Sequence, residues 1–480
     1  MIIEKLRLLG TPNFIATWIL LFVVAFAPLP FGSTDNTAIA FWCLLLSVAV
    51  ILLSTRGLGR GQLWIIAGLF VIVAGYAFVL HEQLSEHPWI APFHPIWKRA
   101  SDVLGETLVP SASIVRNEPF FAIGPTLANI MALLLGLVVG SDRRRSRQIM
   151  LVIATSGALY ALYGVLSFLI EPGLILWRDK KFYTSSVTGT FINRNSAATY
   201  FGSCAVLWLL FLLHKIRRRI PHRRLVWKRL IRDLPHFPAR EILPPSGALL
   251  ICLMALLMTG SRAGVALSLL MMIIAFTLFL KKDLPPRSGV WISLGAGAVV
   301  ALGLLQLFGG RVSNRFDSQG LVDEGRIEIW KSTLRIIADF PWFGTGLGTI
   351  TQAYPAYRSP LMSIRGVLEA AHSTPLDLAS EVGLPLTALV AAGWIGMQLV
   401  LLRGCINRRR SSMLLPLAAL AISSLALLHS LIDFSLQIPG YTIPFFALFG
   451  AGLSQAIPSG TRERGNITDK SPAHSAGGVR

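Results

Sequence analysis

The chain has 480 residues, of which 53% are hydrophobic and only 14% are charged, and its formal net charge is +20. Soluble domains carry about 25% charged residues, so this composition excludes an ordinary globular enzyme and indicates a membrane protein. A cationic excess is also typical of nucleic-acid-binding proteins, and the distribution of the charge has to decide between the two classes.

Apolar stretches long enough to cross about 30 Å of hydrocarbon, roughly 17–25 residues each, recur along most of the chain. They predict an all-α integral membrane protein with about twelve transmembrane helices. We expect these helices at residues 13–29, 37–54, 62–80, 120–139, 149–170, 195–213, 246–258, 263–280, 290–308, 384–402, 413–428 and 441–453. The first runs into Pro28-Leu29-Pro30 without a small-residue cleavage site, so we interpret it as a retained helix.

Lysine and arginine gather in alternate loops between these helices. The basic runs lie at residues 143–145, 215–240, 281–282 and 408–410, and all fall on one side when the N-terminal end is placed inside. The positive-inside rule explains this segregation, because short Lys/Arg-rich loops resist translocation. The pattern predicts a bacterial inner-membrane protein with cytoplasmic termini and membrane lipid around it, and it argues against a nucleic-acid partner.

Two outer segments are long, at residues 81–119 and 309–382, and the second mixes charged residues with glycine-rich turns. A long extracytoplasmic loop with its own helices usually carries function. We therefore divide the chain into N-terminal helices (1–187), a core that includes the loop 309–382 (188–456), and a disordered cytoplasmic tail (457–480). None of the four cysteines falls on the outer side, so neither a disulfide nor a cysteine-based metal site is expected.

Four short motifs fall on the outer side of this topology. They are Thr-Gly-Thr-Phe-Ile-Asn-Arg-Asn at 188–195, Thr-Gly-Ser-Arg-Ala-Gly at 259–264, Gly-Arg-Ile-Glu-Ile-Trp at 325–330 with Gly-Thr-Gly-Leu-Gly at 344–348, and Ala-His-Ser-Thr-Pro-Leu at 371–376 with Glu-Val-Gly at 381–383. In this order, and with His-Ser-Leu-Ile-Asp-Phe at 429–434, they resemble the O-antigen ligase/polymerase superfamily over about residues 188–440. Ser373 stands where many members carry Asn.

The resemblance implies a GT-C-like membrane glycosyltransferase that takes a glycan from undecaprenyl pyrophosphate without a metal or other cofactor. The residues fit this chemistry, because a pyrophosphate leaving group needs cations and the arginine fork binds phosphate oxygens bidentately. Arg194, Arg262 and Arg326 are the candidate donor pyrophosphate clamp, with Arg194 and Arg262 also counted as catalytic. His372 is the candidate base for the acceptor hydroxyl.

Four further residues are accessory candidates: Asn193, Asn195, Glu381 and Asp433. Plainer interpretations stay open for several of these positions. An arginine at a helix end can simply reach lipid phosphate. Asp433 can orient a charged partner or cap a helix, and we expect the glycines at 344–348 to form a turn rather than a phosphate loop.

The expected activity is therefore transfer of an undecaprenyl-pyrophosphate-linked glycan to an acceptor on the periplasmic face, with inversion at the anomeric carbon. A lipid A-core acceptor would make the protein a ligase, which we favour; a glycan acceptor would make it an O-antigen or exopolysaccharide polymerase, and a protein acceptor an oligosaccharyltransferase. A lipid-linked glycan flippase or exporter is a weaker alternative, because the predicted spans contain few ionisable residues away from their ends.

Overall fold

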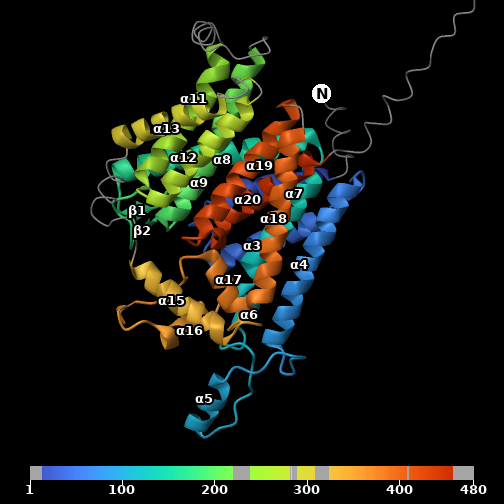
Figure 1. The fold of residues 1–480 in the computed structure, drawn as a ribbon, viewed down its shortest axis with the longest axis vertical. Coiled ribbons are helices and arrows are strands. Elements are labelled where there is room, and N and C mark those ends of the chain that lie inside the picture. Colours follow the sequence, from blue (N-terminus) through green and yellow to red (C-terminus); the bar gives the residue numbers. More distant parts are fainter. Residues whose placement is uncertain are drawn as a thin grey trace, which may run out of the picture.

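The computed structural model describes residues 13–219, 238–281, 283, 289–308, 324–364, 366–407 and 410–457. In this part of the chain the fold is almost entirely helical (Figure 1). The strands found there are β1 (Leu174–Ile175) and β2 (Arg178–Asp179), which pair antiparallel in a small hairpin. The predicted cytoplasmic tail and most of the basic 215–240 segment lie outside the described residues.

Every apolar stretch predicted as a span coincides with helix. In chain order the helices are α2 (Phe14–Phe26), α3 (Asn36–Ile51), α4 (Arg60–Leu84), α6 (Glu118–Ala122) with α7 (Gly124–Val139), α8 (Arg143–Ile170), α9 (Arg194–Arg219), α11 (Ala239–Met258), α12 (Arg262–Leu280), α13 (Gly289–Phe308), α18 (Leu384–Asn407), α19 (Arg410–Ser430) and α20 (Pro439–Ala456).

Within the described ranges, 8 helices are long and apolar enough to cross a membrane. Helices α2 and α3 are apolar but shorter, with 13 and 16 residues. The structure therefore supports a multi-pass all-α membrane protein, whereas the figure of about twelve spans stays a prediction.

Several helices extend beyond the predicted apolar stretches, whereas α2 and α3 end before them. Helix α8 begins at Arg143, where the Asp142 carboxylate accepts backbone N–H bonds from Arg144 and Arg145. Helix α18 continues to Asn407, so Cys405, which we expected in an inner loop, is helical and buried. The expected boundaries were wrong there because backbone hydrogen bonding continues where the apolar pattern ends.

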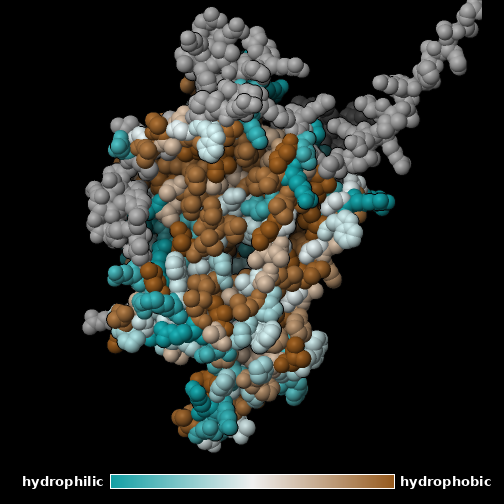
Figure 2. Space-filling view, viewed as in Figure 1, coloured by the Kyte–Doolittle hydropathy of each residue, from teal (hydrophilic) through white to brown (hydrophobic). Residues whose placement is uncertain are grey.

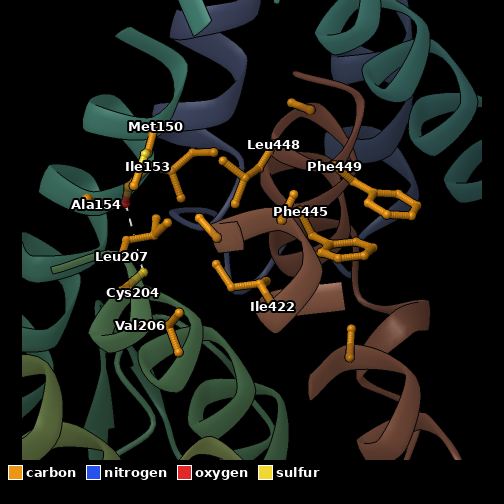
Figure 3. Packing of buried hydrophobic residues seen from close by; sticks show 14 of the residues in the cluster. Met150, Ile153, Ala154, Cys204, Val206, Leu207, Ile422, Phe445, Leu448 and Phe449 are labelled. Atoms are coloured by element: carbon orange, nitrogen blue, oxygen red, sulfur yellow. Dashed lines mark hydrogen bonds between the residues drawn. The ribbon is translucent and has the colours of Figure 1, made fainter. Parts of the chain in front are cut away.

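The centre of the bundle is held together by very close helix contacts. A methyl group on Gly136 of α7 would lie 2.1 Å from the Ala447 carbonyl oxygen of α20, and one on Gly202 of α9 would lie 1.9 Å from the Ser268 hydroxyl of α12. Small residues let helix backbones approach in this way inside a membrane. Figure 3 shows the neighbouring apolar packing, in which side chains of α8 and α9 such as Ile153 meet Ile422 and Phe445 of α19 and α20.

The predicted outer segment forms helices of its own at one end of the bundle. They are α15 (Glu324–Asp339), α16 (Ile350–Ala353), the 3-10 turn η2 (Tyr354–Tyr357) and α17 (Thr374–Val382). Helix α5 (Ile96–Leu104), from the other long outer loop, lies beyond them at the lower end of Figure 1. In Figure 2 apolar side chains dominate the visible sides of the bundle, and hydrophilic ones are more frequent toward this lower end.

Candidate active site

The 188–195 motif forms the turn that leads into α9. The Thr190 hydroxyl donates to the Pro28 carbonyl oxygen at 2.6 Å, which fixes the turn against the chain after α2. The Asn193 side-chain oxygen accepts the backbone N–H of Asn195 at 2.7 Å, a helix-capping bond that satisfies one of the free N–H groups of the first turn. Asn193 therefore sets the start of the helix, and Arg194 is its first residue.

Arg194 is half-buried and lies against an aromatic ring. Its guanidinium carbon is 5.0 Å from the centre of the Tyr183 ring, within range of a cation–π contact. The Nε and Nη1 atoms are buried and have no hydrogen-bond partner among the described residues. The buried hydroxyls of Thr188 and Ser196, one on each side of Arg194 in the chain, likewise have none there. Unpaired buried donors of this kind are rare and call for a partner.

Arg262 begins α12 in a closely similar way. Gly260 has a φ of 61°, a left-handed conformation that breaks the apolar run between α11 and α12. The Ser261 hydroxyl then accepts the Gly264 N–H at 3.3 Å and caps the new helix. The predicted tight turn with an arginine at its end is thus present.

The starts of α9 and α12 lie side by side. A methyl group on Gly264 would lie 2.6 Å from the Ala198 side chain, so the first turns of the two helices are in direct contact. The Val187 N–H also donates to the Met258 carbonyl oxygen at 3.0 Å, which joins the turn before α9 to the end of α11. Two helix N-termini, each with an arginine, therefore meet at one place.

Arg326 reaches the same region from α15 and is held there by protein groups. Its Nη1 donates to the Ile432 carbonyl oxygen at 2.6 Å, and its Nη2 lies 3.6 Å from Oδ2 of Asp433. The same Asp433 oxygen accepts from Nδ2 of Asn195 at 2.6 Å. Asp433 thus lies beside a charged partner, Arg326, and which of its two interpretations holds stays a prediction.

His372 follows Ala371, whose backbone is held by two hydrogen bonds. The residue has a φ of 55°, uncommon for a side chain other than glycine, and its ring centre is 5.2 Å from that of Phe434. Before it, the Ala371 carbonyl oxygen accepts from the Trp330 indole N–H at 3.1 Å, and the Ala371 N–H donates to the Asp377 carboxylate at 2.7 Å. Phe434 directly follows Asp433, so His372 lies beside the region that holds Arg326.

Glu381 lies near the end of α17, apart from the arginines. Its Oε1 accepts the Ile350 N–H at 3.3 Å. Burial, together with the negative charges of Asp377 and Glu118, raises the pKa of Glu381 to about 8. Burial also raises the pKa of Asp377 to about 7. The glycines at 344, 346 and 348 form the turn we expected, because all three have positive φ. Gly344 packs against Glu381 at the end of α17, whereas Gly348 packs against Ala122.

A cavity of about 530 Å³ adjoins the site. Carboxyl groups of Glu118, Asp377 and Glu381 line it together with apolar side chains of the spans, and Phe434 forms part of its wall. Arg194, Arg262 and Arg326 belong to the part of the chain that the structure describes, and none of them lines this cavity. The charged groups that line the cavity are therefore acidic rather than cationic.

Two buried polar residues, His429 and Glu82, were not among the predicted site residues. His429, which is 1% exposed, has Nδ1 2.8 Å from the Thr199 hydroxyl and 3.1 Å from the Ser435 hydroxyl. Glu82 is fully buried and accepts three backbone N–H groups from residues 89–91. An isolated acid or histidine at the end of an apolar stretch was the available signal, since such residues are costly there without a partner.

Fold and site together define a polytopic helical membrane protein with a cationic, polar site at one end of its bundle. Residues 247–391 of this chain match the family described as O-antigen ligase, which confirms the resemblance to the O-antigen ligase/polymerase superfamily. The matched residues include Arg262, Arg326 and His372, whereas Arg194 and Asp433 lie outside them. The comparison with curated proteins gives no match.

Proposed function

We propose that this protein transfers a glycan from undecaprenyl pyrophosphate to an acceptor at the periplasmic face of the inner membrane, as an inverting, metal-independent glycosyltransferase of GT-C-like type. The family match supports a ligase- or polymerase-type role in O-antigen biosynthesis. Of the two, ligase action on a lipid A-core acceptor is our first choice, and polymerisation is the alternative.

The observation that carries the proposal is the unused hydrogen-bonding capacity at the start of α9. Two buried N–H groups of Arg194 and the hydroxyls of Thr188 and Ser196 have no acceptor among the described residues. The N-terminus of a helix adds its own free N–H groups and the positive end of its dipole. A pyrophosphate supplies several charged oxygens and fits this set of donors, whereas an uncharged ligand would leave the cation buried and uncompensated.

The neighbouring N-termini of α9 and α12 each carry an arginine. Helix dipoles disfavour a cation at the N-terminus, so Arg194 and Arg262 occupy positions that local energetics would give to acidic residues. On the outer side, the positive-inside rule does not require arginine either. Binding of a doubly phosphorylated leaving group would offset the cost of placing a cation at each helix N-terminus. We assign Arg194 and Arg262 to that role.

The reaction needs one proton acceptor besides the cations. The acceptor hydroxyl oxygen forms a bond to the anomeric carbon while the bond from that carbon to the pyrophosphate oxygen breaks. The electron pair leaves with undecaprenyl pyrophosphate, and the hydroxyl proton passes to the imidazole of His372. Attack from the face opposite the leaving group inverts the anomeric centre, and the arginines stabilise the charge that develops on the pyrophosphate.

A deletion strain complemented with variants tests the proposal. Loss of long chains from lipid A-core with accumulation of long lipid-linked polymer would establish a ligase, and accumulation of single repeat units a polymerase. The wild-type gene should restore the glycan profile and Arg194→Ala should not, at equal protein levels in the membrane. An unchanged profile in the deletion strain would refute the glycosyltransferase assignment.

The orientation is also part of the proposal. We place both termini in the cytoplasm and α15 to α17 in the periplasm, because this assignment separates the charge of the loops. In a variant without native cysteines, a cysteine replacing the exposed Asp339 should react with a membrane-impermeant maleimide in intact spheroplasts, and one replacing the exposed Arg143 should react only after lysis. The reverse pattern would put the arginine site on the wrong side for a periplasmic enzyme.

A further inference from the structure

Asp433 contacts three of the segments that carry the candidate functional residues. Its carboxylate accepts from Asn195 on α9 and lies 3.6 Å from Arg326 on α15. Its backbone carbonyl oxygen accepts from the Thr374 hydroxyl at 3.4 Å, two residues after His372. These segments are far apart in the sequence, since Asn195 and Asp433 are separated by 238 residues.

The carboxylate of Asp433 is fixed by further contacts. Its Oδ1 accepts the backbone N–H of Phe434 at 2.9 Å, so one oxygen holds the local chain while the other meets Asn195 and Arg326. The side chain is 1% exposed, whereas that of Arg326 is 25% exposed. A buried carboxylate is tolerated only when it is paired and hydrogen-bonded, and Arg326 supplies the compensating charge.

A second polar group holds the α9 side of this arrangement. The Thr199 hydroxyl donates to the Asn195 carbonyl oxygen at 3.0 Å and lies 2.8 Å from Nδ1 of His429 and 3.2 Å from the Ser435 hydroxyl. If Nδ1 carries the proton, His429 donates to Ser435, Ser435 to Thr199, and Thr199 to Asn195, so every hydroxyl hydrogen has an acceptor. These hydrogen bonds fix the orientation of the first turn of α9 relative to His429 and Ser435.

From these contacts we infer that Asp433 is a positioning residue, which holds Arg326 and the His372–Thr374 segment in register with the start of α9, where Arg194 lies. The inference rests on the proposed function for its effect on transfer, although the structural coupling is independent of it. Asp433 neutralises Arg326 as well, whereas Arg194 at the start of α9 keeps two buried N–H groups without a partner among the described residues. Arg326 then acts chiefly through its place between Ile432 and Asp433.

The test compares Asp433→Asn with a matched pair at the other end of α9. Asparagine keeps the shape and removes the charge, and because Arg326 is partly exposed the variant leaves no isolated charge buried. The control is Asp283→Asn, since Asp283 is equally buried and pairs with Arg217 at 3.1 Å. Both variants are purified as full-length protein in nanodiscs, and their thermal unfolding is compared with that of the wild type.

The first readout is backbone hydrogen exchange, which needs no substrate. Asp433→Asn should speed exchange at residues 324–330 and 371–377 and leave the α9 residues around Arg217 protected. Asp283→Asn should do the reverse. Equal loss of protection throughout the chain in Asp433→Asn would show a general structural role and overturn the inference, and so would unchanged exchange at both outer segments.

The second readout is the rate of glycan transfer and the affinity for undecaprenyl pyrophosphate. Asp433→Asn should lower the transfer rate about tenfold and change affinity less, because the proposed donor contacts are made by other residues. The double variant Asp433→Asn with Arg326→Gln should transfer glycan no more slowly than the slower of the two single variants, since the two residues act as one unit. Additive losses would overturn the inference.

Two further outcomes keep the test decisive. If wild-type protein transfers no glycan, the proposed function fails, and the exchange data still decide the positioning role. If Asp433→Asn does not insert, Thr374→Val removes only the hydroxyl that donates to the Asp433 carbonyl. It should then speed exchange at 371–377 alone, and wild-type exchange in that variant would count against the inference.

Discussion

The two ends of α9 carry Arg–Asp pairs of opposite character. At the Arg219 end, Arg217 binds Asp283 through two hydrogen bonds of 3.2 and 3.1 Å. At the Arg194 end, Arg326 lies 3.6 Å from Asp433, whose oxygen is shared with Asn195.

Helix geometry makes the first end favourable for cations and the second unfavourable, because the dipole is negative at a C-terminus and positive at an N-terminus. In the orientation proposed above, the arginines at 217–219 therefore satisfy both the helix dipole and the positive-inside rule. Arg194 satisfies neither and keeps two buried N–H groups without an acceptor among the described residues. Under the proposed function, arginines therefore serve topology at one end of α9 and ligand binding at the other.

The strongest way to break this comparison is to remove the outer arginines. Arg194→Ala and Arg262→Ala should each lower glycan transfer by about 10²-fold or more, since each leaves phosphate charge unmet in a partly desolvated site. Lysine at these positions should restore little, because it keeps the charge and loses the bidentate fork. The inner Arg219→Ala is the control, because Arg219 and its partner Glu241 are both partly exposed, and it should keep a near-normal rate at equal protein level. Similar rates in outer and inner variants would refute the ligand-binding role.

Replacement of His372 separates proton transfer from donor binding. His372→Ala should reduce the transfer rate by about 10²-fold, in line with the loss of a general base, while affinity for undecaprenyl pyrophosphate stays close to that of the wild type. Single-turnover transfer and a donor-binding assay on the same preparation measure the two effects. A large loss of donor affinity would move His372 from the acceptor side to the pyrophosphate.

A smaller effect is expected on the pH dependence of folding stability, which the carboxyl groups in the cavity should influence. Because the pKa values of Asp377 and Glu381 are raised in the folded protein to about 7 and 8, the folded state binds more protons than the unfolded chain between about pH 5 and 8. Stability should therefore fall as the pH rises through this interval, and Glu381→Gln should make the fall shallower. Thermal unfolding at several pH values measures the slope.

Glu328→Gln is the control for that measurement. The pKa of Glu328 lies below its usual range because Lys331 and Ser359 hydrogen-bond to it, so it stays charged over the whole interval. Its replacement should leave the slope unchanged. A wild-type slope in the Glu381 variant would show that this carboxyl does not control the pH response.

The smallest expected effect is that of chelation, which should be none. Among the described residues, no group of three His, Cys, Asp or Glu side chains is arranged to hold a metal ion, and arginines stand where a pyrophosphate would bind. Transfer should persist after exhaustive EDTA treatment, measured against untreated enzyme in the same assay. An absolute requirement for added Mg²⁺ or Mn²⁺ would contradict the arginine clamp.

Hydropathy was sufficient to locate the long apolar helices, because a membrane span must satisfy its backbone internally and show a long apolar run. Their ends were less predictable. Helix α11 begins at Ala239, seven residues before the expected span, and runs through Pro244 and Pro245. Charged and proline-containing turns can continue a helix beyond the hydrocarbon, and hydropathy does not register them.

The candidate residues were found from motif chemistry, but their partners were not. Nothing in the sequence pairs Asn195 with Asp433 or Thr199 with His429, because contacts between distant helix ends depend on how the bundle packs. For the same reason, the sequence assigned Arg326 to the pyrophosphate clamp on its residue type, whereas the structure gives it protein partners. Residue type therefore suggested the candidate residues, whereas the partners of each residue depend on the tertiary structure.

The close contact between α7 and α20 has a consequence for biogenesis. The Gly136 face of α7 is shaped for α20, and the Gln455 side chain of α20 donates to the Gly140 carbonyl oxygen across 315 residues of sequence. During synthesis α7 enters the membrane long before its partner exists, so this face must meanwhile contact lipid or an insertion chaperone. A ribosome that stalls before α20 would leave an unfinished bundle with an exposed glycine groove, a recognisable substrate for membrane proteases.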